Sequence, residues 1–185
     1  MRINRYLQFL KESKESKKVL IITGEGFQSD EVLKPKESLE SEGYEVTISS
    51  NKTGEFKAFN NDEVVTVQKE LKELNSSDFD LLIIPGGKTP EYLRKKSSVI
   101  NFVKEFNQTG KTIASICHGP LILVSAGLVE GKKMTCFEDA VDELKEVGAK
   151  YKNKSVVIDD NIITSRNPKD LDDFCQAIKE KLKES

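Results

Sequence analysis

The chain has 185 residues, of which 37% are hydrophobic and 32% charged, and its formal net charge is -2. This length suits one domain with a sizeable core, and the interspersed acids and bases exclude the basic surface that nucleic-acid binding needs. No apolar stretch approaches the ~20 residues that span a bilayer, so we expect no membrane partner. The N-terminus lacks the apolar core of a signal peptide, which favours a cytoplasmic location.

The first half of the chain alternates apolar runs with helical periodicity. Residues 1–17 carry Ile3, Tyr6, Leu7 and Leu10 at helical spacing and predict a helical extension ahead of a single domain over 18–185. The sequence of the domain then predicts buried or edge strands and one helix over 31–42, with Pro35 near the start of the helix or at a kink. The predicted strands are 18–23, 44–49, 55–59, 64–67 and 79–84.

The second half continues the alternation to the C-terminus. The predicted elements are a helix over 98–108, a strand over 111–116, a helix over 120–126, paired strands at 156–158 and 162–164, and a helix over 171–182. Apolar strands that alternate with helices indicate a mainly parallel sheet with helices on both faces, an α/β sandwich. The functional site of such a sheet lies at the carboxyl ends of its strands.

One of these carboxyl ends carries the most informative motif, Ser115-Ile-Cys117-His118-Gly119. A strand stops at Cys117 and a helix starts at once behind it, which leaves almost no length for the turn. Such a turn strains its central residue and needs small neighbours, here Ser115 and Gly119, as in the nucleophile elbow of hydrolases. The helix N-terminus behind the sulfur favours its thiolate form.

A second turn ends the strand 79–84 with Pro85-Gly86-Gly87. Glycines let the backbone approach a ligand and turn its N–H groups inward, as an oxyanion hole requires, although Pro-Gly-Gly is also an ordinary strand-ending turn.

The other two cysteines and the single histidine give weaker functional predictions than Cys117. We expect Cys175 to pack in the core, while Cys136 could resolve an oxidised Cys117. No cysteine or histidine spacing predicts a metal or another cofactor.

These motifs, taken together, resemble the ThiJ/PfpI family. The resemblance covers nearly the whole chain, from about Lys18 to Leu182, and rests on four segments in order: 83–91, 114–120, 125–127 and 164–168. It implies a flavodoxin-like three-layer sandwich and self-association as a homodimer or a hexamer built from dimers. Members are described as intracellular cysteine proteases, glyoxalases, protein deglycases and stress proteins.

The resemblance also assigns residues. Cys117 falls on the nucleophile, His118 on the histidine that follows it, and the backbone N–H groups of Gly87 and His118 on the oxyanion hole. Glu91 falls on the acid that supports this histidine from a neighbouring subunit, although it could equally be a helix N-terminal acid. Because adjacent side chains diverge in an elbow, His118 is not required to reach the sulfur of its own chain.

Two departures from the family pattern concern the site lining beside Gly86. An ungapped alignment places Gln28 where the family has a protonated Glu that contacts the sulfur, and a glutamine cannot exchange a proton. Asp30, Glu31 or Glu25 could replace it if the loop is rearranged. Phe137 stands where relatives commonly have Tyr and lacks the hydroxyl.

The sequence thus predicts a cysteine hydrolase or a deglycase or glyoxalase that acts through Cys117 on a small carbonyl or a peptide, weakened by Gln28. The alternative is a non-catalytic, stress- or redox-responsive protein in which Cys117 is oxidised reversibly.

Overall fold

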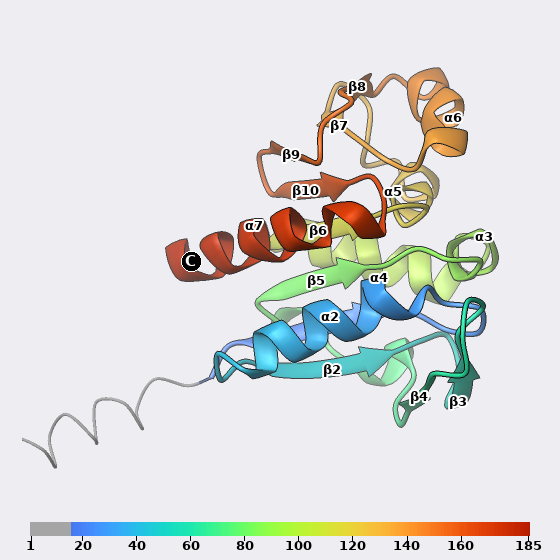
Figure 1. Cartoon of the computed structure of the whole chain (residues 1–185), viewed down its shortest axis with the longest axis vertical. Helices are drawn as coiled ribbons and strands as arrows, with labels where there is room; N and C mark the ends of the chain where they lie inside the picture. The colour runs from blue at the N-terminus through green and yellow to red at the C-terminus, as the bar shows by residue number, and fades with distance from the viewer. Residues whose placement is uncertain (1–15) are drawn as a thin grey trace, which may run out of the picture.

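A computed structural model describes residues 16–185, and the predicted N-terminal helix lies almost wholly outside them. The central sheet has six strands in the order β2-β1-β5-β6-β10-β9, all parallel except β9, which runs antiparallel to β10. Its strands are β1 (Lys18–Ile22), β2 (Glu45–Ser49), β5 (Leu81–Ile84), β6 (Thr112–Ile116), β9 (Val156–Asp159) and β10 (Ile162–Ser165). The predicted α/β fold is confirmed (Figure 1).

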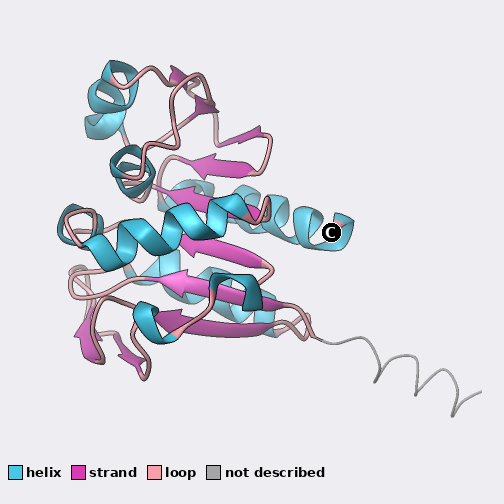
Figure 2. Ribbon diagram, turned by 180° about the vertical axis from the view of Figure 1, so that it is seen from behind, coloured by secondary structure: helices cyan, strands magenta, loops and turns pink. Residues whose placement is uncertain are grey.

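Helices cover both faces of this sheet. In Figure 1, α2 (Ser29–Glu40) and α7 (Leu171–Glu184) lie in front of the sheet, and α4 (Ser97–Gln108) lies behind it, as the opposite view in Figure 2 shows. The chain also forms the short helices α3 (Thr89–Leu93), α5 (Pro120–Ser125) and α6 (Val141–Glu146). The sequence did not predict α3 and α6, because each is too short for a clear helical period.

The alternation of side chains along the strands divides the core in two. Val19 and Ile21 of β1 pack with α2 and α7, whereas Leu20 and Ile22 pack with α4 and α5. All four side chains are at most 1% exposed. A strand buried on both faces must be apolar at every position, which is why β1 and β5 are continuous apolar runs.

Short strands lie outside the main sheet. The predicted edge segments form instead a separate antiparallel hairpin of β3 (Gly54–Lys57) and β4 (Val64–Val67), and β7 (Lys133–Met134) pairs in parallel with β8 (Lys150–Tyr151). The hairpin is linked to the site region through Phe27, which bridges to Ala58 and to Gly87.

Two helical details differ from the predictions. Pro35 lies well inside α2, and Cys175 is only half-buried, in a groove between α2 and α7. Cys175 follows Phe174 on α7 and is therefore rotated away from the fully buried stripe that Phe174 and Ile178 form.

No helix within residues 16–185 is long and apolar enough to cross a membrane.

Candidate active site

The elbow that the sequence predicts forms at the carboxyl end of β6. Cys117 has φ 63°, a left-handed conformation that costs a non-glycine residue about 1–2 kcal/mol. A Cβ on Gly119 would lie 2.2 Å from the carbonyl oxygen of Ile84 and 2.5 Å from Oγ of Ser115. The turn is therefore as tight as the motif indicates, and only glycine fits at position 119.

The glycine turn after β5 lies directly against the elbow. A Cβ on Gly86 would be 2.7 Å from Cβ and 3.0 Å from Sγ of Cys117. Gly87 has φ 89°, and a Cβ there would meet the backbone of Gly26 and Gln28 at 2.6 and 2.5 Å. The N–H groups of Gly87 and His118 are hydrogen-bonded to the sulfur and lower the pKa of the thiol. The two proposed oxyanion donors thus converge on the reactive atom.

Glu31, in the first turn of α2, occupies the position beside the sulfur. Glu31 is fully buried, and its Oε2 accepts a hydrogen bond of 2.7 Å from the Gly86 N–H. Its Oε1 has no hydrogen-bond partner among the described residues. Burial raises the pKa of Glu31 from 4.5 to about 7, against the opposing effects of the Gly86 N–H and the Cys117 thiol.

The expectation for Gln28 was therefore wrong. Gln28 is the N-cap of α2, and its Oε1 accepts a 3.0 Å hydrogen bond from the Glu31 N–H. The cap turns the Gln28 side chain toward the helix and places Glu31 one turn further on, against Gly86. An ungapped comparison of loops could not show which of the acids 25, 30 and 31 faces the thiol. A carboxyl group, that of Glu31, therefore lies beside the thiol.

The pKa of the Cys117 thiol is higher than the sequence predicted from the helix N-terminus behind it. Burial, followed by the negative charge of Glu31, raises the pKa of Cys117 well above its ordinary value. Cys117 is only 6% exposed, and α5 is short and has Pro120 in its first turn, so its N-terminus offers few N–H groups. A thiolate forms at low cost here only when Glu31 is protonated, because two adjacent negative charges are then avoided.

His118 does reach the sulfur of its own chain. Its Nδ1 lies 3.3 Å from Sγ of Cys117, and its Nε2 lies 2.6 Å from Oδ1 of Asp139. The Phe137 ring packs against the imidazole at a centroid distance of 4.9 Å. The Phe137 N–H donates a 2.9 Å hydrogen bond to the carbonyl oxygen of Cys117, which ties the segment that carries Asp139 to the elbow.

Glu91 does not join this group within the chain. It lies on α3, its side chain is 60% exposed, and it forms ion pairs with Lys95 at 2.8 Å and Arg94 at 3.5 Å. Lys95 lowers the pKa of Glu91. Its action on a neighbouring subunit stays a prediction. Asp139, which no motif singled out, supplies the carboxylate at His118 instead.

A cleft lies beside the elbow, on the side of Phe137. Its volume is about 560 Å³, and its lining includes Tyr151, Asn153, Arg166 and Lys169. The guanidinium of Arg166 donates to both carboxylate oxygens of Asp170 at 2.8 and 2.9 Å and to Asn153 at 3.0 Å. Arg166 thus holds its loop, as its place before Asn167-Pro168 suggests.

The described residues contain no group of three or more His, Cys, Asp or Glu side chains that could hold a metal ion.

Comparison with known proteins identifies the family. A model of the DJ-1/PfpI family matches residues 17–181, nearly the whole chain. This chain belongs to the DJ-1/PfpI family. The ThiJ/PfpI resemblance noted from the sequence is thereby confirmed.

Named relatives indicate enzymes. Protein/nucleic acid deglycase 2 of Escherichia coli is 34% identical over 161 residues, which cover 86% of this chain and 94% of that protein. YraA of Bacillus subtilis, whose name assigns it provisionally to the cysteine proteases, is 35% identical over 159 residues, 86% of this chain and 94% of its own length. A two-domain protein from Anabaena variabilis, with DJ-1/ThiJ/PfpI-like and ferritin-like domains, has 32% identity and a TM-score of 0.88; the alignment covers 90% of this chain and about half, 48%, of that one.

Proposed function

We propose that this protein is a cysteine-dependent deglycase of the glyoxalase type, which converts α-oxoaldehydes, free or released from their adducts, to 2-hydroxy acids. The observation that supports this most is the buried Glu31 carboxyl against the Cys117 thiol. Its pKa near 7 lets it hold a proton in one step and release it in the next, which is the property required of a general acid and base near neutral pH.

The proposed reaction begins with addition. The Cys117 thiolate adds to the aldehyde carbon, and the carbonyl oxygen becomes an alkoxide beside the N–H groups of Gly87 and His118. Protonated Glu31 gives its proton to this alkoxide and becomes a carboxylate. The product is a hemithioacetal.

Ionised Glu31 then acts as a base. It takes the proton from the former aldehyde carbon, which leaves an enediolate whose negative charge is on the former ketone oxygen. That oxygen and the former ketone carbon each gain one proton, and the hydroxyl on the sulfur-bearing carbon loses its own. The product is a thioester of a 2-hydroxy acid. Water cleaves the thioester and restores the thiol. The sum is one α-oxoaldehyde plus one water to one 2-hydroxy acid, with no external oxidant or reductant.

The burial of the thiol favours a small substrate over a polypeptide. At 6% exposure, Cys117 can be reached by a two- or three-carbon carbonyl, whereas the backbone of a folded protein would have to enter between two glycine-lined turns. Peptide hydrolysis is the competing reaction, because His118 lies between the thiol and a carboxylate as in cysteine proteases.

The test compares three variants for methylglyoxal consumption, lactate formation and casein cleavage. We expect lactate from the wild type, none from Cys117→Ala, and a rate at least ~100-fold lower for Glu31→Gln, which keeps the shape but cannot exchange a proton. Glu37→Gln, which makes the same change at an exposed position of α2, is the control and should match the wild type.

Full activity of Glu31→Gln would contradict the proposal, as would casein cleavage without lactate. If the wild type forms no lactate but peroxide converts Cys117 to a stable sulfinic acid, the redox-responsive alternative is supported instead.

A further inference from the structure

We infer that Asp139 is the positioning residue for His118 and that it makes this histidine the base that ionises Cys117 within a single chain. The inference rests on the proposed function, because it concerns how the nucleophile of that reaction is formed. Its core is a line of three side chains: Cys117 Sγ, His118 Nδ1 at 3.3 Å, and Asp139 Oδ1 at 2.6 Å from His118 Nε2.

The carboxylate decides the tautomer of the imidazole. An ionised Asp139 can only accept a hydrogen bond, so Nε2 must carry a hydrogen in the neutral ring. Nδ1 is then left with its lone pair, and this lone pair faces the sulfur. The S–H bond can break toward Nδ1, giving a thiolate and an imidazolium whose charge Asp139 balances.

Glu31 is poorly suited to this role, because burial favours its protonated form and the proposed reaction uses its proton for the alkoxide. A second acceptor beside the sulfur keeps the two tasks apart. His118 stands there, and it is the only histidine in the chain.

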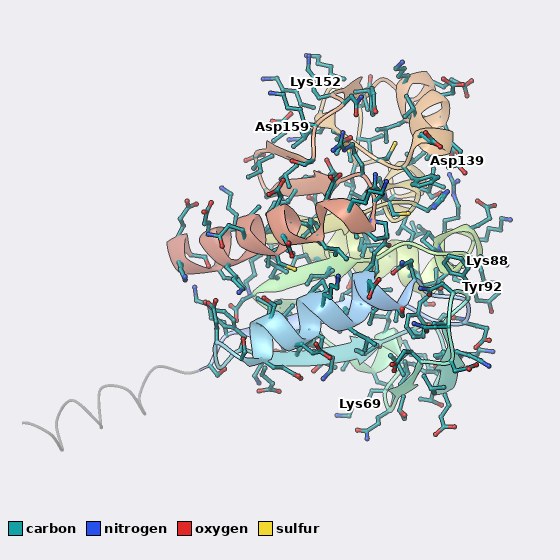
Figure 3. All side chains as sticks on the ribbon, viewed as in Figure 1. Lys69, Lys88, Tyr92, Asp139, Lys152 and Asp159 are labelled. Carbon is teal, nitrogen blue, oxygen red and sulfur yellow. The ribbon has the colours of Figure 1, made fainter. Side chains whose placement is uncertain are left out.

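The backbone holds Asp139 in place although its side chain is 64% exposed. The segment that carries it is tied to the elbow by the Phe137 N–H, which donates to the carbonyl of Cys117 at 2.9 Å. The Ala140 N–H then closes a turn on the Phe137 carbonyl at 3.0 Å, and the turn Glu138–Ala140 follows. Figure 3 shows Asp139 on the same side of the molecule as Lys88, the side to which the carboxyl ends of β5 and β6 point.

Other titratable groups near this line are few. Glu31 acts on Cys117 from α2, and the Cys136 thiol, whose pKa burial raises to about 12, feels the charge of Asp139. Glu91 is occupied by Lys95 and Arg94 and makes no contact with His118 in the chain. The charges of these groups also affect the pH dependence of Cys117 labelling, and they are the same in the wild type and in the Asp139 variants.

The experiment measures iodoacetamide labelling of Cys117 by peptide mass spectrometry between pH 5 and 9, without substrate. We expect Asp139→Asn to slow labelling at pH 7 by about fivefold and to move the pH profile of labelling to higher pH. The effect is modest because water screens the interaction of the exposed Asp139 carboxylate with His118. Asp139→Glu should restore part of the rate. The matched control is Asp142→Asn, an exposed acid on the adjacent α6, which should label like the wild type.

A double variant separates positioning from a general effect of charge. In a His118→Gln background, Asp139→Asn should slow labelling no further, because Asp139 acts through the histidine. Unchanged labelling of Asp139→Asn, or an additional loss in the double variant, would overturn the inference. So would a loss confined to Glu91→Gln, which would assign the role to an acid from another subunit. If labelling depends on Asp139 but no α-oxoaldehyde is consumed, the proposed function fails while the role of Asp139 stands.

Discussion

The Glu31 carboxyl and the Cys117 thiol flank one face of Gly86. A Cβ at position 86 would lie 2.6 Å from Oε2 of Glu31 and 3.0 Å from Sγ of Cys117. The glycine thus leaves the space in which the two groups meet, and its N–H holds the carboxyl at 2.7 Å. A side chain at position 86 would keep the two groups apart, so the proposed proton exchange requires glycine there.

The buried Glu31 should make the stability of the protein depend on pH. Its pKa is 4.5 in the unfolded chain and about 7 in the native state, so between these values the native state holds a proton that the unfolded state has released. The free energy of unfolding therefore falls as the pH rises through this window, by about 3 kcal/mol at 1.36 kcal/mol per unit.

Glu31→Gln should abolish this fall, because glutamine does not titrate and can still accept from the Gly86 N–H. The measurement is urea unfolding of both proteins at pH 5 and pH 8. We expect the variant to gain about 3 kcal/mol relative to the wild type between the two. A constant difference would mean that Glu31 titrates normally.

Gln28 should matter for the helix and not for the chemistry. Gln28→Glu keeps an oxygen that can accept from the Glu31 N–H, so lactate formation should stay within about twofold of the wild type. Gln28→Ala removes the cap and should lower the free energy of unfolding by about 1 kcal/mol. A large gain of activity in Gln28→Glu would restore the view that position 28 faces the thiol.

Gly119→Ala should destabilise the elbow strongly. The new Cβ would lie 2.2 Å from a backbone oxygen, so the end of β5 or the start of α5 must move, at a cost on the order of 3 kcal/mol. Gly110→Ala is the matched control, because it has φ 72° but nothing within 4 Å of the added carbon. It should cost only about 1 kcal/mol of backbone strain, as measured by chemical denaturation.

Glu91→Gln tests the predicted assembly. Within the chain the change removes an exposed ion pair with Lys95, which is worth about 0.5 kcal/mol or less. If Glu91 reaches the His118 of a second subunit, kcat should fall and sedimentation should show a dimer or hexamer. An unchanged kcat in an oligomer would mean that Glu91 stabilises its own helix and does not act on the histidine of another subunit.

Much of the molecule could be predicted from the sequence because the signals involved are local. A continuous apolar run predicts a central parallel strand, and the small residues Ser115 and Gly119 on either side of Cys117 predict a tight turn. The short helices α3 and α6 lack such periodicity and were not predicted.

The partners of Cys117 depended on the tertiary structure. Which of several acids near the start of α2 faces the thiol depends on the capping of that helix by Gln28, a difference of one helical turn. Asp139 reaches His118 because the Phe137 N–H ties its segment to the Cys117 carbonyl, a contact between backbone atoms that no side-chain pattern records. The sequence by itself determined the strained turn at Cys117, because the small residues that this turn needs are its near neighbours in the chain. Only the packing of separate segments decided which carboxyls lie beside Cys117 and His118.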